Sequence, residues 1–456
     1  MSKFKVGAGM ALLDIPLDQY PAMTFSAVCE DKYDDCNCRA IAIESDDKHV
    51  LLLAFELSDI PEVPDLEKKV AEAIGYAEDD IIVTVTHNHT SPCDRGARGS
   101  DPADRAAFQE KFFKVELESA ITAAKVAVDT LRPAKYGYGE VPSFINTNEN
   151  TFEARFGCVY NEEGSGYVDH TLAILKFMDE DDQMICVLMN HPCHATCAMA
   201  LDANGNNATS GNFTGIASRF LEDYYGGGMI AAWTSGAAGN LQPMLNGRVV
   251  VHYTDGYTMR PQLPNGAAHI LMEHVGRQHA IDAVNCIDRI TEYKDEIELV
   301  HVKGSIQIPT QKNLGGDESF KRSPMRMAKI NYGQGVRSNQ TEPAPAAKPN
   351  HIVDDPEHPA ELKMEVLRLG ETAVVGLGCE LFCQIGRDIK QALPAKNTIV
   401  ITHTPGYVGD NPHAVGYIVD KSSLDSRSPK LYRNLKPGYY DEMIVDAVKE
   451  LYEKTV

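Results

Sequence analysis

Runs of apolar residues alternate with helical patterns along the chain. The runs at residues 50–56 and 80–85 are almost wholly apolar or β-branched, which is typical of buried strands. Apolar residues recur at helical spacing in residues 64–75 and 102–131, which predicts two amphipathic helices. A strand, a helix, a strand and a helix in this order predict an α/β fold of layered, mixed sheets flanked by helices.

The same alternation continues through most of the chain. Further strands are expected at residues 5–16, 23–28, 38–44, 171–178, 184–190, 229–233, 295–308, 364–370, 372–377 and 397–403, short strand-like pieces at 134–160, and helices at 209–225, 265–288 and up to Ile389. Residues 312–362 are irregular and rich in Pro, Asn, Gly and Lys, so we expect a lid, an interface arm or a linker there. Because no internal repeat is present, we predict a single domain over residues 1–456 with an insertion at about 312–362.

Two histidines follow the strand at residues 80–85, in the segment THNHTSP. Side chains alternate along a strand, so His87 and His89 are expected on the same side. Two neutral imidazoles at a strand end suit a borderline-soft divalent ion, and zinc first. A pair of hydrogen-bonded structural histidines would give the same motif, and one His-x-His does not decide between them.

A second strand end carries more imidazoles, because the strand at residues 184–190 runs into His191-Pro192-Cys193-His194. This repetition favours the metal interpretation. Glu380 lies between a buried strand and a helix, so it is either a helix cap or a third ligand. Glu56 also ends a buried strand, and there we favour a cap. The small-residue loop 235–243 is either a plain turn or a place where backbone amides approach a ligand closely.

The bulk composition narrows the classes of partner. The 456 residues are 43% hydrophobic and carry a formal net charge of −22, which argues against nucleic acid and anionic membranes as partners. We therefore expect a small-molecule substrate, and a homo-oligomer is left open. The chain shows neither an apolar signal core near its first residue nor a stretch of transmembrane length, so we expect a cytoplasmic protein. Eleven cysteines, an odd number, are expected to be mostly free thiols.

The ordered set of motifs resembles the neutral ceramidases, specifically their N-terminal catalytic domain and its shorter bacterial relatives. Five stretches carry the resemblance across nearly all of residues 5–420: VGAGMALLDIP, THNHTSP, NHPCHA, the pair SGNFTGIAS and AAWTSGAAGNLQP, and EVLRLGETAVVGLGCELF. The resemblance implies a layered α/β domain with zinc (Zn2+) at its centre.

The resemblance also implies a ligand set. His87 looks like the first zinc ligand, His191 the second and Glu380 the third. A tyrosine in a G-Y-[IV] segment completes the family's site; Tyr417 matches better than Tyr407, and both stay open. His89 would then support a ligand or carry protons, and His194 is a second candidate for proton transfer.

Three positions depart from the family's pattern. Gln242 stands where the family has a serine at the reaction centre, and Thr147 stands where its amide-binding arginine follows an Ile-Asn pair. Asn212 replaces the aspartate of the family's S-G-D. With Asn240, these residues are the candidates for substrate binding and orientation, and they make ceramide a doubtful substrate.

Three functions are consistent with these motifs. The first is a zinc-dependent hydrolase, an amidase (amidohydrolase) or lactonase, acting on a small polar cytoplasmic metabolite with water as nucleophile. The second is a zinc lyase or isomerase on the same scaffold, because a fold does not fix a reaction. The third is a non-catalytic metal-binding relative.

Overall fold

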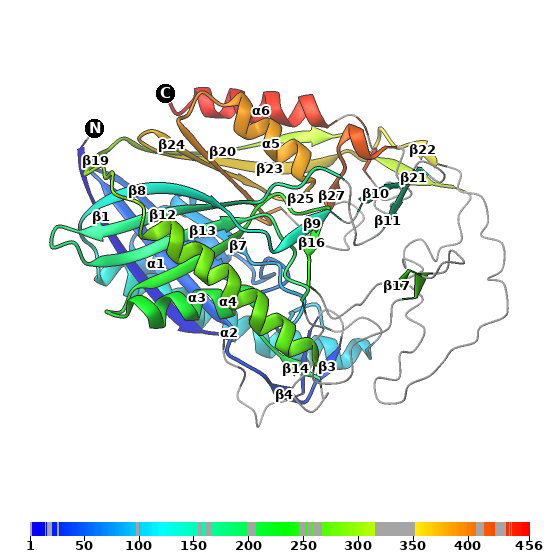
Figure 1. The fold of residues 1–456 in the computed structure, drawn as a ribbon, viewed down its shortest axis with the longest axis horizontal. Coiled ribbons are helices and arrows are strands. Elements are labelled where there is room, and N and C mark those ends of the chain that lie inside the picture. The colour runs from blue at the N-terminus through cyan, green and yellow to red at the C-terminus, as the bar shows by residue number, and fades with distance from the viewer. Residues whose placement is uncertain are drawn as a thin grey trace.

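Two β-sheets pack face to face, and helices cover the outer side of each (Figure 1). The computed structural model describes residues 2–13, 15, 21–24, 27–96, 100–148, 150–153, 157–160, 166–197, 207–245, 251–252, 258–259, 267–314, 352–406, 415–424, 435–436, 438 and 440–456. The layers are helices, larger sheet, smaller sheet and helices again, as the sequence predicted for a layered α/β fold. The two chain ends lie at one end of the layers, away from β9, β16, β25 and β27 (Figure 1).

The larger sheet is mixed and has the strand order β15-β13-β12-β8-β1-β5-β6-β7, with β19 also pairing with β1. Its strands are β1 (Ser2–Leu12), β5 (Asn37–Ser45), β6 (Lys48–Phe55), β7 (Ile81–Val85), β8 (Arg132–Pro142), β12 (Thr171–Asp179), β13 (Met184–His191), β15 (Ile230–Ser235) and β19 (Glu296–Ile297). Its outer face is covered by α1 (Leu66–Ile74), α2 (Pro102–Asp129), α3 (Asn212–Tyr225) and α4 (Ala267–Ile287).

Strand β6 shows why the predicted apolar runs are continuous. Leu51 and Leu53 pack into the core under α1 and α2, whereas Val50 and Leu52 pack into the core between the sheets. Because side chains alternate and both faces are covered, every position needs an apolar residue. The strand is therefore buried on both sides, as its sequence predicted.

The smaller sheet has the order β20-β23-β24-β26 and is covered on its outer side by two helices. Its strands are β20 (Leu299–Ile308), β23 (Ala360–Leu369), β24 (Thr372–Leu377) and β26 (Asn397–Thr402), and the helices are α5 (Cys383–Ala392) and α6 (Asp441–Glu453). Along β23, Val366 packs towards these helices and Leu367 packs towards the larger sheet.

Short strand pairs and turns connect the layers. They are β2 (Ala22–Met23) with β3 (Val28–Cys29), β4 (Asp31–Lys32) with β14 (Ala208–Thr209), β9 (Asn146–Asn148) with β16 (Leu241–Pro243), β10 (Asn150–Glu153) with β11 (Gly157–Tyr160), β17 (Val251–His252) with β18 (Thr258–Met259), β21 (Gln311–Asn313) with β22 (Ile352–Asp354), β25 (Glu380–Leu381) with β27 (Tyr417–Ile418), and the 3-10 turns Glu78–Asp80 and Lys421–Ser423.

Some elements differ from the sequence prediction. Strand β8 is one strand of eleven residues where only short pieces were expected, because it is paired along its length with β12. Residues 23–28 belong to two short paired strands rather than one strand. Helix α6 was not predicted at all. Of the expected insertion at 312–362, strands β21 and β22 pair at its two ends, and residues 315–351 lie outside the described part of the chain.

Strand ends from both sheets meet at one place. The hydroxyl of Thr84 on β7 donates to the carbonyl of Thr402 on β26 at 3.3 Å, and Thr402 donates in turn to the carbonyl of Gly236 after β15 at 2.7 Å. Asn88, just after β7, forms a parallel bridge with Ala195, just after β13. The loops after β7, β13, β15 and β26 are thus held together, although β7 and β15 lie at opposite edges of the larger sheet.

A buried ion-pair network ties the larger sheet to α3. Arg39 on β5 is 1% exposed and pairs with Glu56, while its Nε donates to Glu222 of α3 at 2.7 Å. Glu56 also accepts from the backbone N–H of Asn37 at 2.8 Å. Glu56 therefore holds the ends of β5 and β6 together and pairs with a buried cation, which agrees with a structural role rather than a place in the site.

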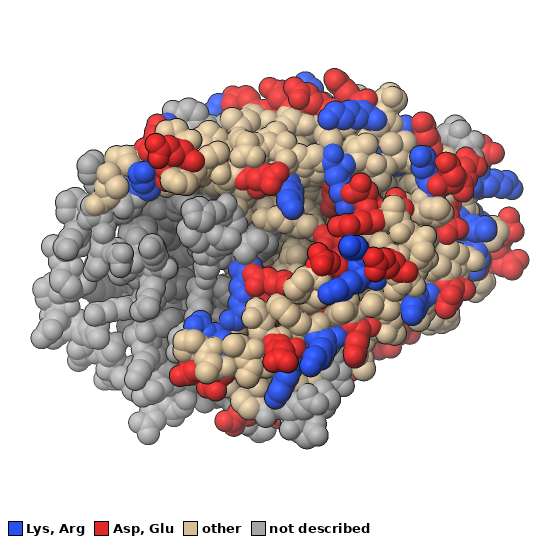
Figure 2. Space-filling view, turned by 180° about the vertical axis from the view of Figure 1, so that it is seen from behind, with Lys and Arg blue, Asp and Glu red and all other residues tan. Residues whose placement is uncertain are grey.

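The described surface carries mixed charge. Figure 2 shows acidic side chains spread over one face with basic side chains between them. In the described residues, no helix is both long and apolar enough to cross a membrane. The ten cysteines of the described chain are buried and free, as expected.

We predict that Arg39→Met destabilises the protein by about 3–5 kcal/mol, because it leaves two buried carboxylates without their cation. Urea unfolding would measure this. Arg277→Met is the matched control, since Arg277 forms only an exposed pair with Glu273 on α4 and should lose less than about 0.5 kcal/mol. Equal stability of the two variants would contradict the structural role of the network.

Candidate metal site

His87 begins the site, two residues after β7 ends. Its ring is buried, and its Nδ1 donates to the carbonyl oxygen of Ser58 at 2.6 Å. A carbonyl only accepts, so Nδ1 carries the proton and Nε2 presents a lone pair. His87 has φ of +54°, which is uncommon for a side chain of this size and often marks a functional position.

His194 presents a second Nε2 in the same way. Its Nδ1 donates to the carbonyl oxygens of Ala238 at 2.7 Å and Leu241 at 3.2 Å, both in the loop after β15. Its backbone N–H also donates to Leu241 at 3.1 Å. The small-residue loop therefore fixes the orientation and tautomer of His194.

Glu380 supplies the carboxylate between the two imidazoles. Its Oε2 lies 3.1 Å from Nε2 of His194 and 3.4 Å from Nε2 of His87. Strand β25 is paired in parallel with β27, which places Glu380 opposite Tyr417. The Tyr417 hydroxyl lies 3.3 Å from Nε2 of His194. Two imidazoles, a carboxylate and a phenol thus converge from four separate segments.

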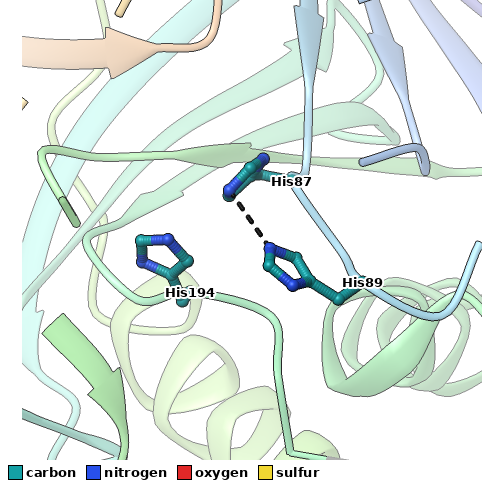
Figure 3. A group of neighbouring side chains, drawn as sticks. All are labelled: His87, His89 and His194. Carbon is teal, nitrogen blue, oxygen red and sulfur yellow. Dashed lines mark hydrogen bonds between the residues drawn. The ribbon is translucent and has the colours of Figure 1, made fainter. Parts of the chain in front are cut away.

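His89 lies at the edge of this group. Figure 3 shows the imidazoles of His87, His89 and His194 converging on one point. The Nε2 atoms of His87 and His89 are 3.3 Å apart, and the backbone N–H of His89 donates to Ala195 at 3.2 Å. His89 is half-buried, whereas His87 and His194 are buried.

The electrostatics of the site favour an anionic Glu380. Burial by itself raises the pKa of its carboxyl, but His87 and His194 outweigh this and hold the pKa well below its usual value. Burial likewise lowers the pKa of His87, but Glu380 outweighs it and the pKa is raised. A buried carboxylate among nitrogen lone pairs requires a cation nearby.

These donors fit a divalent metal ion. Ligand atoms of His87, His89 and His194 lie within 4.8 Å of one another, as do those of His87, Glu380 and His403. Imidazoles whose other nitrogen is bonded to a carbonyl are the usual ligands of zinc and similar ions. The residues that would hold the ion are His87, His194, Glu380 and Tyr417.

Comparison with known proteins agrees with this arrangement. Residues 38–260 match the model of the neutral/alkaline non-lysosomal ceramidase N-terminal family. The structure is similar to the crystal structure of neutral ceramidase from Pseudomonas aeruginosa, with a TM-score of 0.69 and 17% identity over 100% of this chain and 75% of that chain. A second solved structure, a ceramidase complexed with C2, matches with the same TM-score and identity and 76% of its chain covered. No curated protein matches the chain.

The chain is a relative of the neutral ceramidases. The resemblance inferred from its motifs is thereby confirmed, and the mixed, layered fold is that of the neutral ceramidase structures. This relationship indicates a hydrolase of the ceramidase family, whose reaction breaks an amide bond.

In this ceramidase relative, His191 lies elsewhere than we expected. It is the last residue of β13, its Nδ1 bonds to the carbonyl of Thr171 at 3.1 Å, and its ring packs 4.9 Å from that of His279 on α4. Burial lowers the pKa of His191 to about 4. Side chains alternate along β13, so His191 shares the helix-facing side with Val187 and Met189. The structure thus places His194 beside Glu380, where His191 was expected.

His403 is a site residue that the sequence analysis did not single out. Its ring stacks on His87 with centroids 4.0 Å apart and planes at 18°. Thr402 has one hydroxyl proton, which goes to Gly236, so its oxygen accepts from Nδ1 of His403 at 2.9 Å. His403 has φ of +58° and follows β26 directly. The signal available in the sequence was a histidine at a third buried strand end.

The predicted substrate-binding residues divide into two groups. Asn212 is buried at the start of α3 and donates to the Thr90 hydroxyl at 3.0 Å, while Asn240 accepts from the N–H of Cys383 at the start of α5 at 2.9 Å. These two asparagines support the segments that carry His89 and Glu380. Thr147 and Gln242 are half-buried and lie opposite each other in the β9–β16 pair. Tyr407, the alternative to Tyr417, lies outside the described residues.

The loop 235–243 approaches another part of the chain rather than a ligand. A Cβ on Gly239 would lie 2.6 Å from the carbonyl oxygen of Glu380, and the N–H of Gly239 donates to Leu381 at 2.8 Å. Only glycine allows this approach. The loop therefore supports both His194 and Glu380.

We predict that His194→Gln loses most of the bound metal, whereas His191→Gln keeps it. The removal of one ligand commonly weakens metal affinity by several orders of magnitude, and a histidine packed against α4 contributes no ligand atom. Elemental analysis of the two purified variants, with circular dichroism to verify folding, makes the comparison. Loss of metal only in the His191 variant would reverse the assignment.

Proposed function

We propose that this ceramidase relative is a zinc-dependent hydrolase of an amide or lactone bond in a small polar metabolite. The observation that carries the proposal is the convergence of His87, His194, Glu380 and Tyr417, all with their ligand atoms towards one point. A buried, asymmetric set of nitrogen and oxygen ligands is typical of hydrolytic zinc sites.

The bound ion would supply a Lewis acid and lower the pKa of a coordinated water. The chain's own residues prepare the site for it. Ser58 and Ala238 hold His87 and His194 in the tautomer that keeps Nε2 unprotonated. Half-buried His89 lies at the open edge and is placed to accept a proton at its ring and pass it to the leaving group. Gln242 and Thr147 would orient the substrate beside these groups.

Ceramide is not the substrate we propose. Gln242 and Thr147 stand where the family pattern has a serine and an arginine, and a neutral pair at these positions does not reproduce their chemistry. The two departures also motivate the lyase or isomerase alternative, in which the ion would stabilise an enolate. A hydrolase incorporates oxygen from water into its product, and those enzymes differ in this respect.

The test is a screen of the zinc-loaded protein against a panel of amides and lactones in 18O-labelled water. We expect hydrolysis of at least one compound, with one labelled oxygen in the acid product. Chelation should abolish the activity and added zinc should restore it, while Glu380→Gln should lower kcat/KM by about a thousandfold or more, since it removes an anionic ligand. Turnover without label would favour a lyase or isomerase, and no turnover across the panel would contradict the proposal.

We also predict no release of fatty acid from a short-chain ceramide in detergent. The physical reason is the loss of both polar groups that the family pattern uses at the scissile amide. Thin-layer or mass-spectrometric detection of free fatty acid would measure it, with the same protein preparation shown to bind zinc. Robust release would make the departures irrelevant to substrate choice.

A further inference from the structure

The two strands β9 and β16 form a polar ribbon whose two faces differ in exposure. Thr147 and Gln242 are direct cross-strand partners, so their side chains project to the same face. Both are half-buried, whereas their neighbours Leu241, Asn146 and Asn148 are buried. One face of the ribbon thus packs into the protein, and the face that carries Thr147 and Gln242 is open.

The ribbon is fixed to the candidate metal site on both strands. Leu241 accepts from the backbone N–H of His194, at 3.1 Å, and from its ring, at 3.2 Å. Asn146 donates to the carbonyl of Pro192 at 2.6 Å, in the same turn. Each of the two open side chains is therefore adjacent to a residue bonded to the turn at 192–194. Such short connections keep a subsite in register with the reacting centre.

A third residue fixes the Gln242 carboxamide. The Thr196 hydroxyl donates to Oε1 of Gln242 at 2.6 Å, and Thr196 is only two residues beyond His194. Because the oxygen of the carboxamide is occupied, its NH2 group is directed away from Thr196 as a donor. An immobilised carboxamide loses less rotamer freedom on binding a ligand than a free glutamine side chain does.

The chemistry of these three residues is uncharged. Two hydroxyls and one carboxamide can donate to and accept from a hydroxyl or an amide, but none of them forms an ion pair. A substrate carboxylate or ammonium would lose hydration here without a counter-charge, which is unfavourable at a half-buried position. We propose that Thr147, Thr196 and Gln242 form a subsite that selects amides carrying a neutral hydroxyl or carboxamide group and rejects charged ones. This inference rests on the proposed amide hydrolase.

Three small probes of matched size test the subsite: N-(2-hydroxyethyl)acetamide, N-acetylglycine and N-(2-aminoethyl)acetamide. Their binding to the zinc-loaded protein is measured by ligand-observed NMR titration, and their hydrolysis is measured in parallel. We expect the hydroxyl probe to bind at least about tenfold more tightly than either charged probe, because each charged probe lacks a counter-charge. Equal or tighter binding of a charged probe, or no binding of any probe, would overturn the subsite.

Variants of the same residues sharpen the test. Gln242→Glu keeps the shape and adds a negative charge, so the amine probe should become the preferred one. Thr147→Val and Thr196→Val keep the volume and remove one hydroxyl, and each should weaken binding of the hydroxyl probe by about two- to tenfold. Gln183→Glu, at an exposed turn between β12 and β13, is the matched control and should leave the order of the probes unchanged.

The outcomes separate this inference from the proposed function. Selective binding of the hydroxyl probe without hydrolysis of any amide would support the subsite and contradict the hydrolase. Hydrolysis of amides with an unchanged order of probes in Gln242→Glu would support the hydrolase and overturn the subsite.

Discussion

The buried carboxylate of Glu380 is the constraint on which this site depends. It lies within 3.4 Å of two imidazole nitrogens that come from opposite ends of the larger sheet's strand order. A buried anion is stable only with a cation or strong donors beside it. Both imidazoles have committed their other nitrogen to backbone carbonyls, so the centre between them is arranged for a positive charge. The charge requirement and the ligand geometry thus point to the same occupant.

The fold meets this constraint by bringing strand ends together rather than by local sequence. The hydroxyls of Thr84 and Thr402 link β7, β26 and the loop after β15, and the bridge between Asn88 and Ala195 joins the segments after β7 and β13. The left-handed backbone of His87 and His403 adds local strain that the surrounding contacts must hold. Rigid, strained strand ends are suited to keeping ligands in place before any ion binds.

The sequence predicted the elements better than it predicted the site. Continuous apolar strands such as β6 were recognised because burial on both faces leaves a local signal, and α/β layering followed from their order. The family resemblance brought out His87, Glu380 and Tyr417. It did not separate His191 from His194, because that depends on which face of β13 points to α4 and on how the chain turns back at Pro192. His403 was missed for the same reason: its stacking on His87 is a contact between two sheets.

The departures at Thr147 and Gln242 gain meaning only from the pairing of β9 with β16. In the sequence they lie 95 positions apart and read as two separate losses from a family pattern. In the structure they are one cross-strand pair on one half-exposed face, with Thr196 holding one member in place. A residue that replaces a charged or nucleophilic neighbour must satisfy the group opposite it, so changes at paired positions are coupled. The pair is therefore better understood as one altered binding surface beside a retained ligand set than as decay of the site.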